Sequence, residues 1–115
     1  MISRPLMDKL LTFRKEREWE QFHNLRTLST SIALEAAELA EFTQWARDDE
    51  IEEISKEHRA EIALEIADIA ILLSYLAHDL GVELEQAVSS KLELNARRYP
   101  VSKAKKKKKK YDRLE

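Results

Sequence analysis

The scarcity of helix breakers constrains the fold of this chain more than any other feature. Its 115 residues include one Gly and two Pro. Ala, Leu, Glu and Lys are frequent, and apolar residues recur with the 3.6-residue period of a helix over long runs. We therefore expect an all-α protein. A chain of this length forms one domain with a modest core, so a second copy is an expected source of further buried surface.

Four helices follow from the periodicity and the breakers. The first begins near Pro5, a residue tolerated in a first helical turn, and ends about Arg17. Residues 18–23 are rich in aromatics and predict a loop or short turn. The other three helices are expected over residues 24 or 27 to 46, 51 or 55 to 79, and 84 to 97 or 98. Gly81 stands where a left-handed C-terminal cap is expected, and Pro100 marks the end of the last helix.

Two acidic pairs lie inside apolar helical runs: Glu35 with Glu38, and Glu65 with Asp68. Residues three apart share one helix face, and no Lys or Arg lies within four residues of any of these carboxylates. Four carboxylates near buried surface would repel one another and lose solvation. A divalent cation makes such a cluster favourable, and ligands that are all oxygen suit Mg²⁺, with Mn²⁺ as a substitute. The alternative is a solvated acidic face.

The chemistry of the pairs narrows the type of metal site. Di-iron helical bundles use Glu-x-x-His motifs, whereas the residue three past Glu35 is Glu38 and the residue three past Glu65 is Asp68. The pattern therefore points to a hard cation. Mg²⁺ commonly bridges protein carboxylates to substrate phosphates, which makes a nucleotide or diphosphate the expected substrate class.

Aromatic residues flank the second predicted helix. Trp19 and Phe22 precede it and Trp45 lies near its far end, and aromatic faces of this kind can stack on a nucleobase. His23 is a candidate base contact or general acid. Taken singly, each aromatic is more simply a packing anchor and the histidine a polar surface residue.

A polar stripe lies on the last predicted helix. Lys91, Asn95 and Arg98 recur at i, i+4 and i+7, so they share one face. Two cations and an amide would suit phosphate oxygens. Favourable charge near a helix C-terminus explains the same spacing equally well.

The formal charge of −2 conceals an acidic body and a basic tail. Residues 103–115 hold 8 of the 20 Lys and Arg residues and 2 of the 22 acidic ones. We expect a domain over residues 1–102 and a solvated, disordered Lys-rich tail over residues 103–115. No apolar run approaches the roughly 18 residues of a membrane span, no cysteine is present, and the N-terminus lacks the apolar core of a secretory signal. We expect a cytoplasmic protein without a membrane partner.

The motifs taken together resemble a known family. The sequences Glu-Ala-Ala-Glu at 35–38 and Glu-Ile-Ala-Asp at 65–68 match the E-x-x-E and E-x-x-D pattern of MazG-like all-α nucleoside triphosphate pyrophosphohydrolases. The segments 18–23, 42–45 and 91–101 are similar to those of the dCTP pyrophosphatase branch. The resemblance covers roughly residues 5–103.

The resemblance implies a helical bundle completed by a partner chain, as a dimer or a tetramer. It implies hydrolysis of dCTP, or of a related pyrimidine nucleotide, modified or unmodified, to the monophosphate and pyrophosphate, as a cleansing of the nucleotide pool. The implied metal ligands are Glu35, Glu38, Glu65 and Asp68, and Glu38 would also orient or deprotonate the attacking water. Trp19, His23 and Trp45 would line the base and sugar pocket, and Lys91, Asn95 and Arg98 would contact phosphates.

A second hypothesis comes from another class of protein. The chain could be a non-catalytic helical interaction module whose Lys tail binds nucleic acid or another polyanion. We rank it below the enzyme and do not expect nucleic acid as a partner, since the tail alone favours it.

Overall fold

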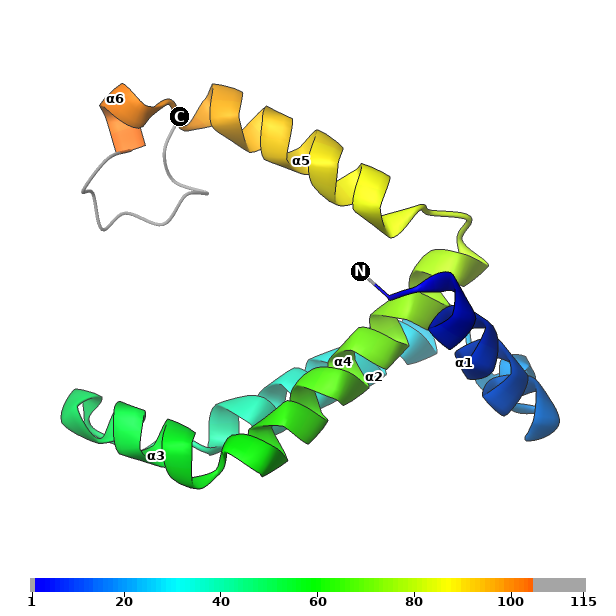
Figure 1. Ribbon diagram of the computed structural model, residues 1–115, viewed down its shortest axis with the longest axis horizontal. Coiled ribbons are helices and arrows are strands. Elements are labelled where there is room, and N and C mark those ends of the chain that lie inside the picture. Colours follow the sequence, from blue (N-terminus) through cyan, green and yellow to red (C-terminus); the bar gives the residue numbers. More distant parts are fainter. Residues whose placement is uncertain (1, 105–115) are drawn as a thin grey trace. The chain divides into compact units, whose positions relative to one another are not determined.

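The computed structural model describes residues 2–104, and every regular element in that range is helical (Figure 1). The predicted all-α class is confirmed. The chain divides into two compact parts, one of residues 2–81 and one that begins at Val82. No helix within the described range is long and apolar enough to cross a membrane.

The first part is built around two paired helices. Helix α2 (Leu25–Glu41) packs along α4 (Arg59–Asp79), as Figure 1 shows. Helix α1 (Arg4–Glu16) contacts α4 and the 3-10 turn η1 (Trp19–Phe22). Helix α3 (Ile51–Glu57) contacts α4 and the 3-10 turn η2 (Asp48–Glu50). The two acidic motifs therefore lie on the two helices that are packed together.

The second part consists of α5 (Leu84–Arg98) and the short α6 (Val101–Ala104). The side chain of Glu83 caps α5 by accepting hydrogen bonds from the backbone N–H groups of Glu85 and Gln86, at 3.3 and 2.9 Å. Helix α5 has the expected bounds. Of the tail predicted to be disordered, residues 103 and 104 belong to α6, and residues 105–115 lie outside the described range. The domain boundary at 102 stays a prediction.

Local sequence explains where the helices of the first part begin and end. Asn24 and Thr27 form a reciprocal capping box at the start of α2, with both side chain to backbone distances at 2.9 Å. After α4, Gly81 takes the left-handed conformation, with φ at 68°, and its N–H donates to the carbonyl of His78. A residue without Cβ adopts this conformation at no steric cost, which confirms the predicted cap.

Two of the predicted helix bounds are wrong. The second helix ends at Glu41 rather than at residue 46, and i to i+3 hydrogen bonds turn the chain through residues 42–46. The helix expected over residues 51–79 is interrupted at His58, whose φ and ψ are −105° and 20°. The His58 ring lies 5.5 Å from the Phe42 ring, and its Nδ1 lies 3.0 Å from the Glu61 carboxylate. The ring contact between Phe42 and His58 depends on tertiary packing, so helical periodicity could not reveal it.

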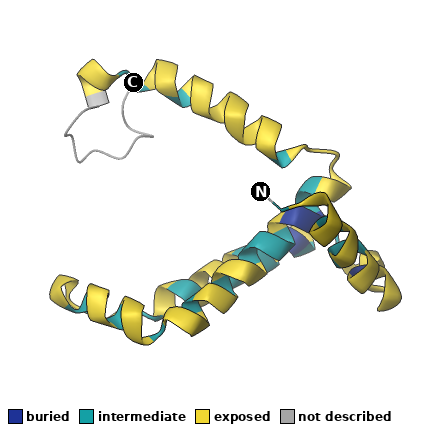
Figure 2. Ribbon diagram, viewed as in Figure 1, coloured by how far each residue is buried: buried dark blue, intermediate teal, exposed yellow. Residues whose placement is uncertain are grey.

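A buried arginine joins α1 to α4. Arg14 is 3 % exposed, and its guanidinium donates two hydrogen bonds of 2.9 Å to the carboxylate of Asp79. The same guanidinium lies 4.6 Å from the centre of the Tyr75 ring, and the Tyr75 hydroxyl donates to the carbonyl of Leu10 at 2.6 Å. Figure 2 shows that the few buried positions gather where α1 meets the C-terminal half of α4.

We expect Asp79→Ala to destabilise the fold strongly, because it leaves the Arg14 guanidinium buried without its counter-ion. The free energy of unfolding should fall by about 3 kcal/mol in chemical denaturation. Asp49→Ala removes an ion pair with Arg47 whose two side chains are both 76 % exposed, and it serves as the matched control. That control should change stability little. Equal losses in the two variants would show that the Arg14 pair does not anchor α1.

Candidate functional site

Three carboxylates from the paired helices converge. Glu35 and Glu38 of α2 and Glu65 of α4 can each place one oxygen within 4.8 Å of the others. Glu35 and Glu65 are half-buried, whereas Glu38 is exposed. The i, i+3 spacing puts both α2 carboxylates on the face that α4 covers, so the packing of α2 on α4 brings the two acidic motifs together.

The residues present fit a cation. One oxygen each of Glu35 and Glu65 (Oε2 in both) is buried and has no hydrogen-bond partner. A buried polar atom without a partner is costly, and a buried anionic oxygen more so. A divalent cation held by carboxylate oxygens would remove both costs, and hard cations such as Mg²⁺ prefer this set of ligand atoms.

The electrostatics of the cluster agree with this interpretation. The pKa of Glu65 is raised from 4.5 to about 7. The largest cause is the nearby Glu35 carboxylate, which could accept a hydrogen bond from Glu65 once Glu65 is protonated. Partial burial and the negative charges of Glu38 and Glu35 act in the same direction. Without a cation, a proton on Glu65 reduces the repulsion between the three carboxylates.

A pocket of about 390 Å³ opens beside the cluster, within the size range of small-molecule sites. Its polar lining residues are His23, Glu35 and Asp68. The rest of its lining is apolar or aromatic: Leu10, Phe13, Trp19, Ile71, Leu72 and Tyr75. The wall is therefore mostly apolar, with a few polar groups that can orient a ligand.

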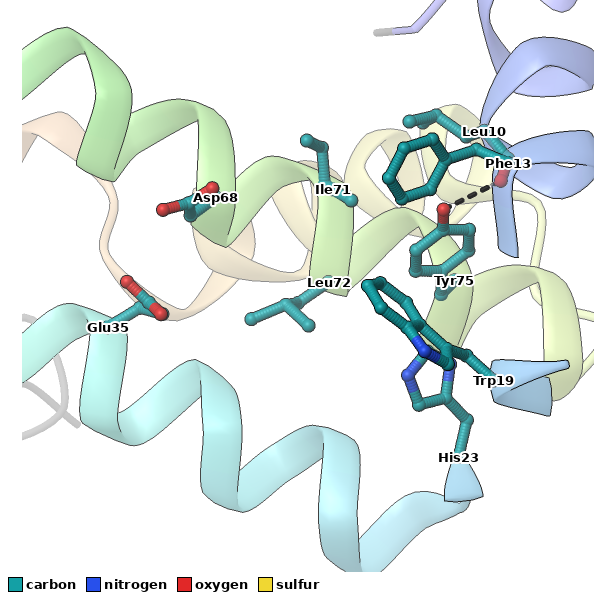
Figure 3. A pocket seen from close by; sticks show the side chains of 9 residues that line it. All are labelled: Leu10, Phe13, Trp19, His23, Glu35, Asp68, Ile71, Leu72 and Tyr75. Atoms are coloured by element: carbon teal, nitrogen blue, oxygen red, sulfur yellow. Dashed lines mark hydrogen bonds between the residues drawn. The ribbon is translucent and has the colours of Figure 1, made fainter. Parts of the chain in front are cut away.

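Figure 3 shows that the pocket has two chemically different ends. The carboxylates of Glu35 and Asp68 lie at one end, between α2 and α4, and the rings of Trp19 and His23 lie together at the other. Leu72 lies between them. A ligand that fills the pocket would place a charged, metal-binding group at the first end and a flat ring at the second.

The aromatic end is organised by a strained turn. Glu18 adopts the left-handed conformation, with φ at 54°, directly before Trp19, and Gln21 donates a side-chain hydrogen bond to the Glu18 carbonyl at 2.9 Å. The Trp19 ring meets Phe13 edge to face at 5.7 Å between centroids. Left-handed backbone at a residue with a side chain is rare and marks turns that position functional groups. Trp19 remains 44 % exposed and so is accessible to a ligand.

The structure brings together some of the predicted site residues and not others. Asp68 is exposed and lines the pocket with Glu35, but it is outside the tight trio of carboxylates. Trp45 lies in the turn after α2, is 88 % exposed and does not line the pocket. Lys91, Asn95 and Arg98 lie on α5, in the second part of the chain, where Lys91 and Arg98 are exposed and Asn95 is half-buried. Their roles stay predictions.

Sequence reasoning missed several pocket residues. Tyr75 lies seven residues after Asp68 and therefore two turns further along the same face of α4. This spacing could have predicted that Tyr75 lies on the same side of α4 as Asp68. Phe13 likewise lies one turn after Leu10 on α1. No local pattern could have paired Arg14 with Asp79, since 65 residues separate them.

The sequence also matches a known protein family. The sequence profile of the MazG-like family matches residues 30–114. The chain belongs to the MazG-like family. This confirms the resemblance inferred from the acidic motifs, both of which lie inside the matched range.

Individual proteins similar to this chain are named as pyrophosphatases. The chain is 45 % identical over 91 residues to dCTP pyrophosphatase 1 of Bos taurus, covering 77 % of this chain and 54 % of the relative. It is 41 % identical over 104 residues to dCTP pyrophosphatase 1 of Homo sapiens, covering 89 % and 61 %. The chain thus spans between half and two thirds of the length of these curated relatives.

A solved structure supports the fold. The crystal structure of a pyrophosphatase from Archaeoglobus fulgidus is similar, with a TM-score of 0.81 and 39 % sequence identity. The match covers 84 % of this chain and 90 % of that one. The all-α arrangement described above is therefore one that a known pyrophosphatase also adopts.

The raised pKa of Glu65 predicts how the stability of the metal-free protein depends on pH. The folded state holds a proton on Glu65 up to about pH 7, whereas the unfolded chain loses it near the ordinary value of 4.5. The resulting stabilisation is fully present below pH 4.5 and is lost as the pH rises through about 7. We expect the melting temperature of the wild-type protein to fall more between pH 5 and pH 8 than that of Glu65→Gln.

The control is Glu93→Gln, on α5 and outside the cluster, which should follow the wild type. Added Mg²⁺ should raise the melting temperature of the wild type more at pH 8 than at pH 5, because protons and the cation compete for the same oxygens. An equal Mg²⁺ effect at both pH values, or in the Glu65→Gln variant, would place the cation elsewhere.

Proposed function

We propose that this chain is a Mg²⁺-dependent nucleotide pyrophosphohydrolase that cleaves dCTP, or a related pyrimidine nucleoside triphosphate, to the monophosphate and pyrophosphate. The observation that carries the proposal is the convergence of Glu35, Glu38 and Glu65 beside a pocket. Glu35 and Asp68 line one end of that pocket, and its other end is aromatic. Relatives named dCTP pyrophosphatase, at 41 and 45 % identity, support the choice of substrate. Nucleotide-pool cleansing in the cytoplasm is the corresponding biological role.

The charged end accounts for the chemistry of cleavage. We assign Glu35, Glu38, Glu65 and Asp68 as the residues that hold the metal, with Mn²⁺ as a substitute for Mg²⁺. When bound there, the cation supplies charge neutralisation for the phosphates of the substrate. Hydrolysis of a phosphoanhydride requires mainly positioning and electrostatic stabilisation, so no nucleophilic side chain is needed.

Glu38 is the best candidate for handling the attacking water. It is the exposed member of the trio, so water can approach it, whereas the buried oxygens of Glu35 and Glu65 suit a cation better. A carboxylate within hydrogen-bond reach of a water can orient it and accept its proton. The proton from the water then resides on the Glu38 carboxylate until it exchanges with solvent.

The aromatic end accounts for recognition. Trp19 offers an accessible ring on which a base can stack, and His23 offers a polar edge beside it. We keep Trp45 as a proposed base contact and Lys91, Asn95 and Arg98 as proposed phosphate contacts, on the basis of the family resemblance. The stripe of two cations and an amide on one face of α5 has the chemistry that phosphate oxygens require.

The competing hypothesis of a non-catalytic, polyanion-binding module has no support among the described residues. All of the Lys-rich tail on which it depends, except residues 103 and 104, lies outside the described range. The carboxylate cluster and the relatives named pyrophosphatases favour the enzyme.

We also propose that the chain works as a homo-oligomer, a dimer or a tetramer. The only apolar residues that are buried in the described part of the chain are Leu28 and Tyr75. On the paired helices, Leu34 of α2 is 61 % exposed and Leu64 of α4 is 68 % exposed. Large apolar residues left in water on the main helices are typical of surfaces that a partner covers.

The decisive activity test measures pyrophosphate release from a panel of canonical and 5-modified nucleoside triphosphates, with and without Mg²⁺. We expect release that depends on Mg²⁺, a monophosphate product, and dCTP or a modified pyrimidine as the preferred substrate. Glu38→Gln should remain folded, with a melting temperature at or above that of the metal-free wild type, and lose at least about a hundredfold in kcat, the range for a lost general base. Turnover near the wild-type rate in that variant would remove Glu38 from the role assigned here.

The oligomeric state is tested by light scattering coupled to size-exclusion chromatography. We expect a mass above the 13.5 kDa of one chain and a shift toward that mass in Leu64→Asp. Ser29→Asp adds the same charge at an exposed polar position of α2 and should leave the mass unchanged. A wild-type protein that elutes as a 13.5 kDa monomer at micromolar concentration would contradict the proposal.

A further inference from the structure

His23 is held from behind by a group that can only donate hydrogen bonds. Its Nδ1 lies 3.3 Å from Nη1 of Arg14, and the Arg14 side chain is buried. A guanidinium has five N–H donors and no acceptor, and it does not lose its proton in proteins. For this contact to be a hydrogen bond, Nδ1 of His23 must accept it. The imidazole is then neutral, and its single proton is on Nε2.

The arginine is itself fixed by a second partner. Its two hydrogen bonds of 2.9 Å to Asp79 and its position 4.6 Å from the centre of the Tyr75 ring leave it little freedom to move. The Tyr75 ring also lies 5.6 Å from the His23 ring. Residues from α1 and α4 thus hold the imidazole in one orientation as well as one tautomer, with Nδ1 engaged and Nε2 left for a ligand.

Arg14 lies behind the pocket and His23 lines it. We propose that Arg14 and Asp79 act as positioning residues that lock His23 as a neutral Nε2–H donor, and that this donor selects nucleobases with a carbonyl acceptor. The proposal rests on the proposed function for the identity of the ligand, and on the geometry alone for the state of His23. It replaces the earlier alternative of a general acid, because a histidine locked in the neutral form has no second proton to give.

The electrostatics of the site support a neutral imidazole. The pKa of His23 is lowered, first by partial burial and then by the positive charge of Arg14, while the negative charge of Asp79 opposes the shift. The pKa of the third neighbouring titratable group, Tyr75, is raised mainly by burial, so its hydroxyl keeps its proton at neutral pH. The lowered pKa of His23 thus favours the neutral form of its imidazole.

The position in the pocket explains why the acceptor belongs to the base. His23 lies with Trp19 at the end away from Glu35 and Asp68 (Figure 3). If the phosphates lie with the metal at the carboxylate end, the group stacked on Trp19 is the base. Pyrimidine bases carry a ring carbonyl at position 2, which a fixed N–H donor beside the stacking platform can recognise. A site built around a buried donor rejects ligands that lack the matching acceptor.

The first test is nitrogen-15 NMR of the histidine rings in the free protein, with His23→Leu used to assign the His23 signals. We expect the Nε2–H tautomer at pH 7 and a titration midpoint below 6.5. An Nδ1–H tautomer, or an imidazolium at pH 7, would overturn the proposal. This measurement needs no substrate and does not depend on activity.

The second test removes the Arg14–Asp79 ion pair without leaving a buried charge. The double variant Arg14→Met with Asp79→Leu replaces both partners by apolar residues, a change that folded proteins commonly tolerate. We expect a mixture of His23 tautomers and a midpoint closer to 6.5. Arg17→Met is the matched control, because Arg17 lies one turn further along, over the Phe13 ring, and does not touch His23. An unchanged His23 tautomer in the double variant would show that Arg14 does not set it.

The third test measures selection of the base. Nucleotide affinity is determined by calorimetry in the Glu38→Gln background, in which substrate persists, for dCTP, its 2-thio analogue and its 3′-deoxy analogue. With His23 present, we expect the 2-thio analogue to bind roughly three- to tenfold more weakly, the effect of one hydrogen bond, and His23→Leu to abolish the difference. A penalty that follows the 3′-hydroxyl instead would assign His23 to the sugar and overturn base selection. If no nucleotide binds to Glu38→Gln, with or without His23→Leu, the proposed function fails. The NMR result still decides the state of His23 in that case.

Discussion

The repulsion between carboxylates on two packed helices is the constraint on which the rest of this structure depends. Helices α2 and α4 must lie together to bury their apolar faces, yet each carries acidic residues into the contact. The unpartnered oxygens of Glu35 and Glu65 and the raised pKa of Glu65 both report that cost. A cation bound there would relieve the repulsion, and it would link the stability of the fold to the ion that the proposed chemistry needs.

The opposite end of the pocket is organised by a different principle. There a buried guanidinium, its counter-ion Asp79 and the Tyr75 ring tie α1 to α4 and hold His23 in place. A paired and hydrogen-bonded charge contributes more to orientation than to stability. The pocket thus combines a charged end, which a cation would complete, and an aromatic end that is already organised. That division suits a ligand with a charged phosphate chain and a flat base.

The faces that carry the candidate site could be predicted from the sequence, because helical spacing is a local property. The i, i+3 pairs at 35–38 and 65–68 define one face of each helix from the sequence alone, and the absence of nearby cations marks them as unusual. The contact between the two pairs across α2 and α4 belongs to the tertiary structure, although the apolar runs around them indicated that they lie near buried surface. By contrast, the break at His58 and the early end of α2 accompany a contact between the Phe42 and His58 rings, which periodicity does not encode.

The sequence by itself determined the all-α class, the caps at Asn24 and Gly81, and the identity of the carboxylates, because each depends on residues within a turn or two of one another. Only the tertiary structure decided that Glu35, Glu38 and Glu65 form the tight trio, and that Trp19 lines a pocket together with Glu35 and Asp68 while Trp45 does not. It also decided that Arg14 reaches Asp79 and His23. The physical reason is that a buried ion pair is selected by the packing of distant helices, and residues 65 positions apart leave no periodic trace of their contact.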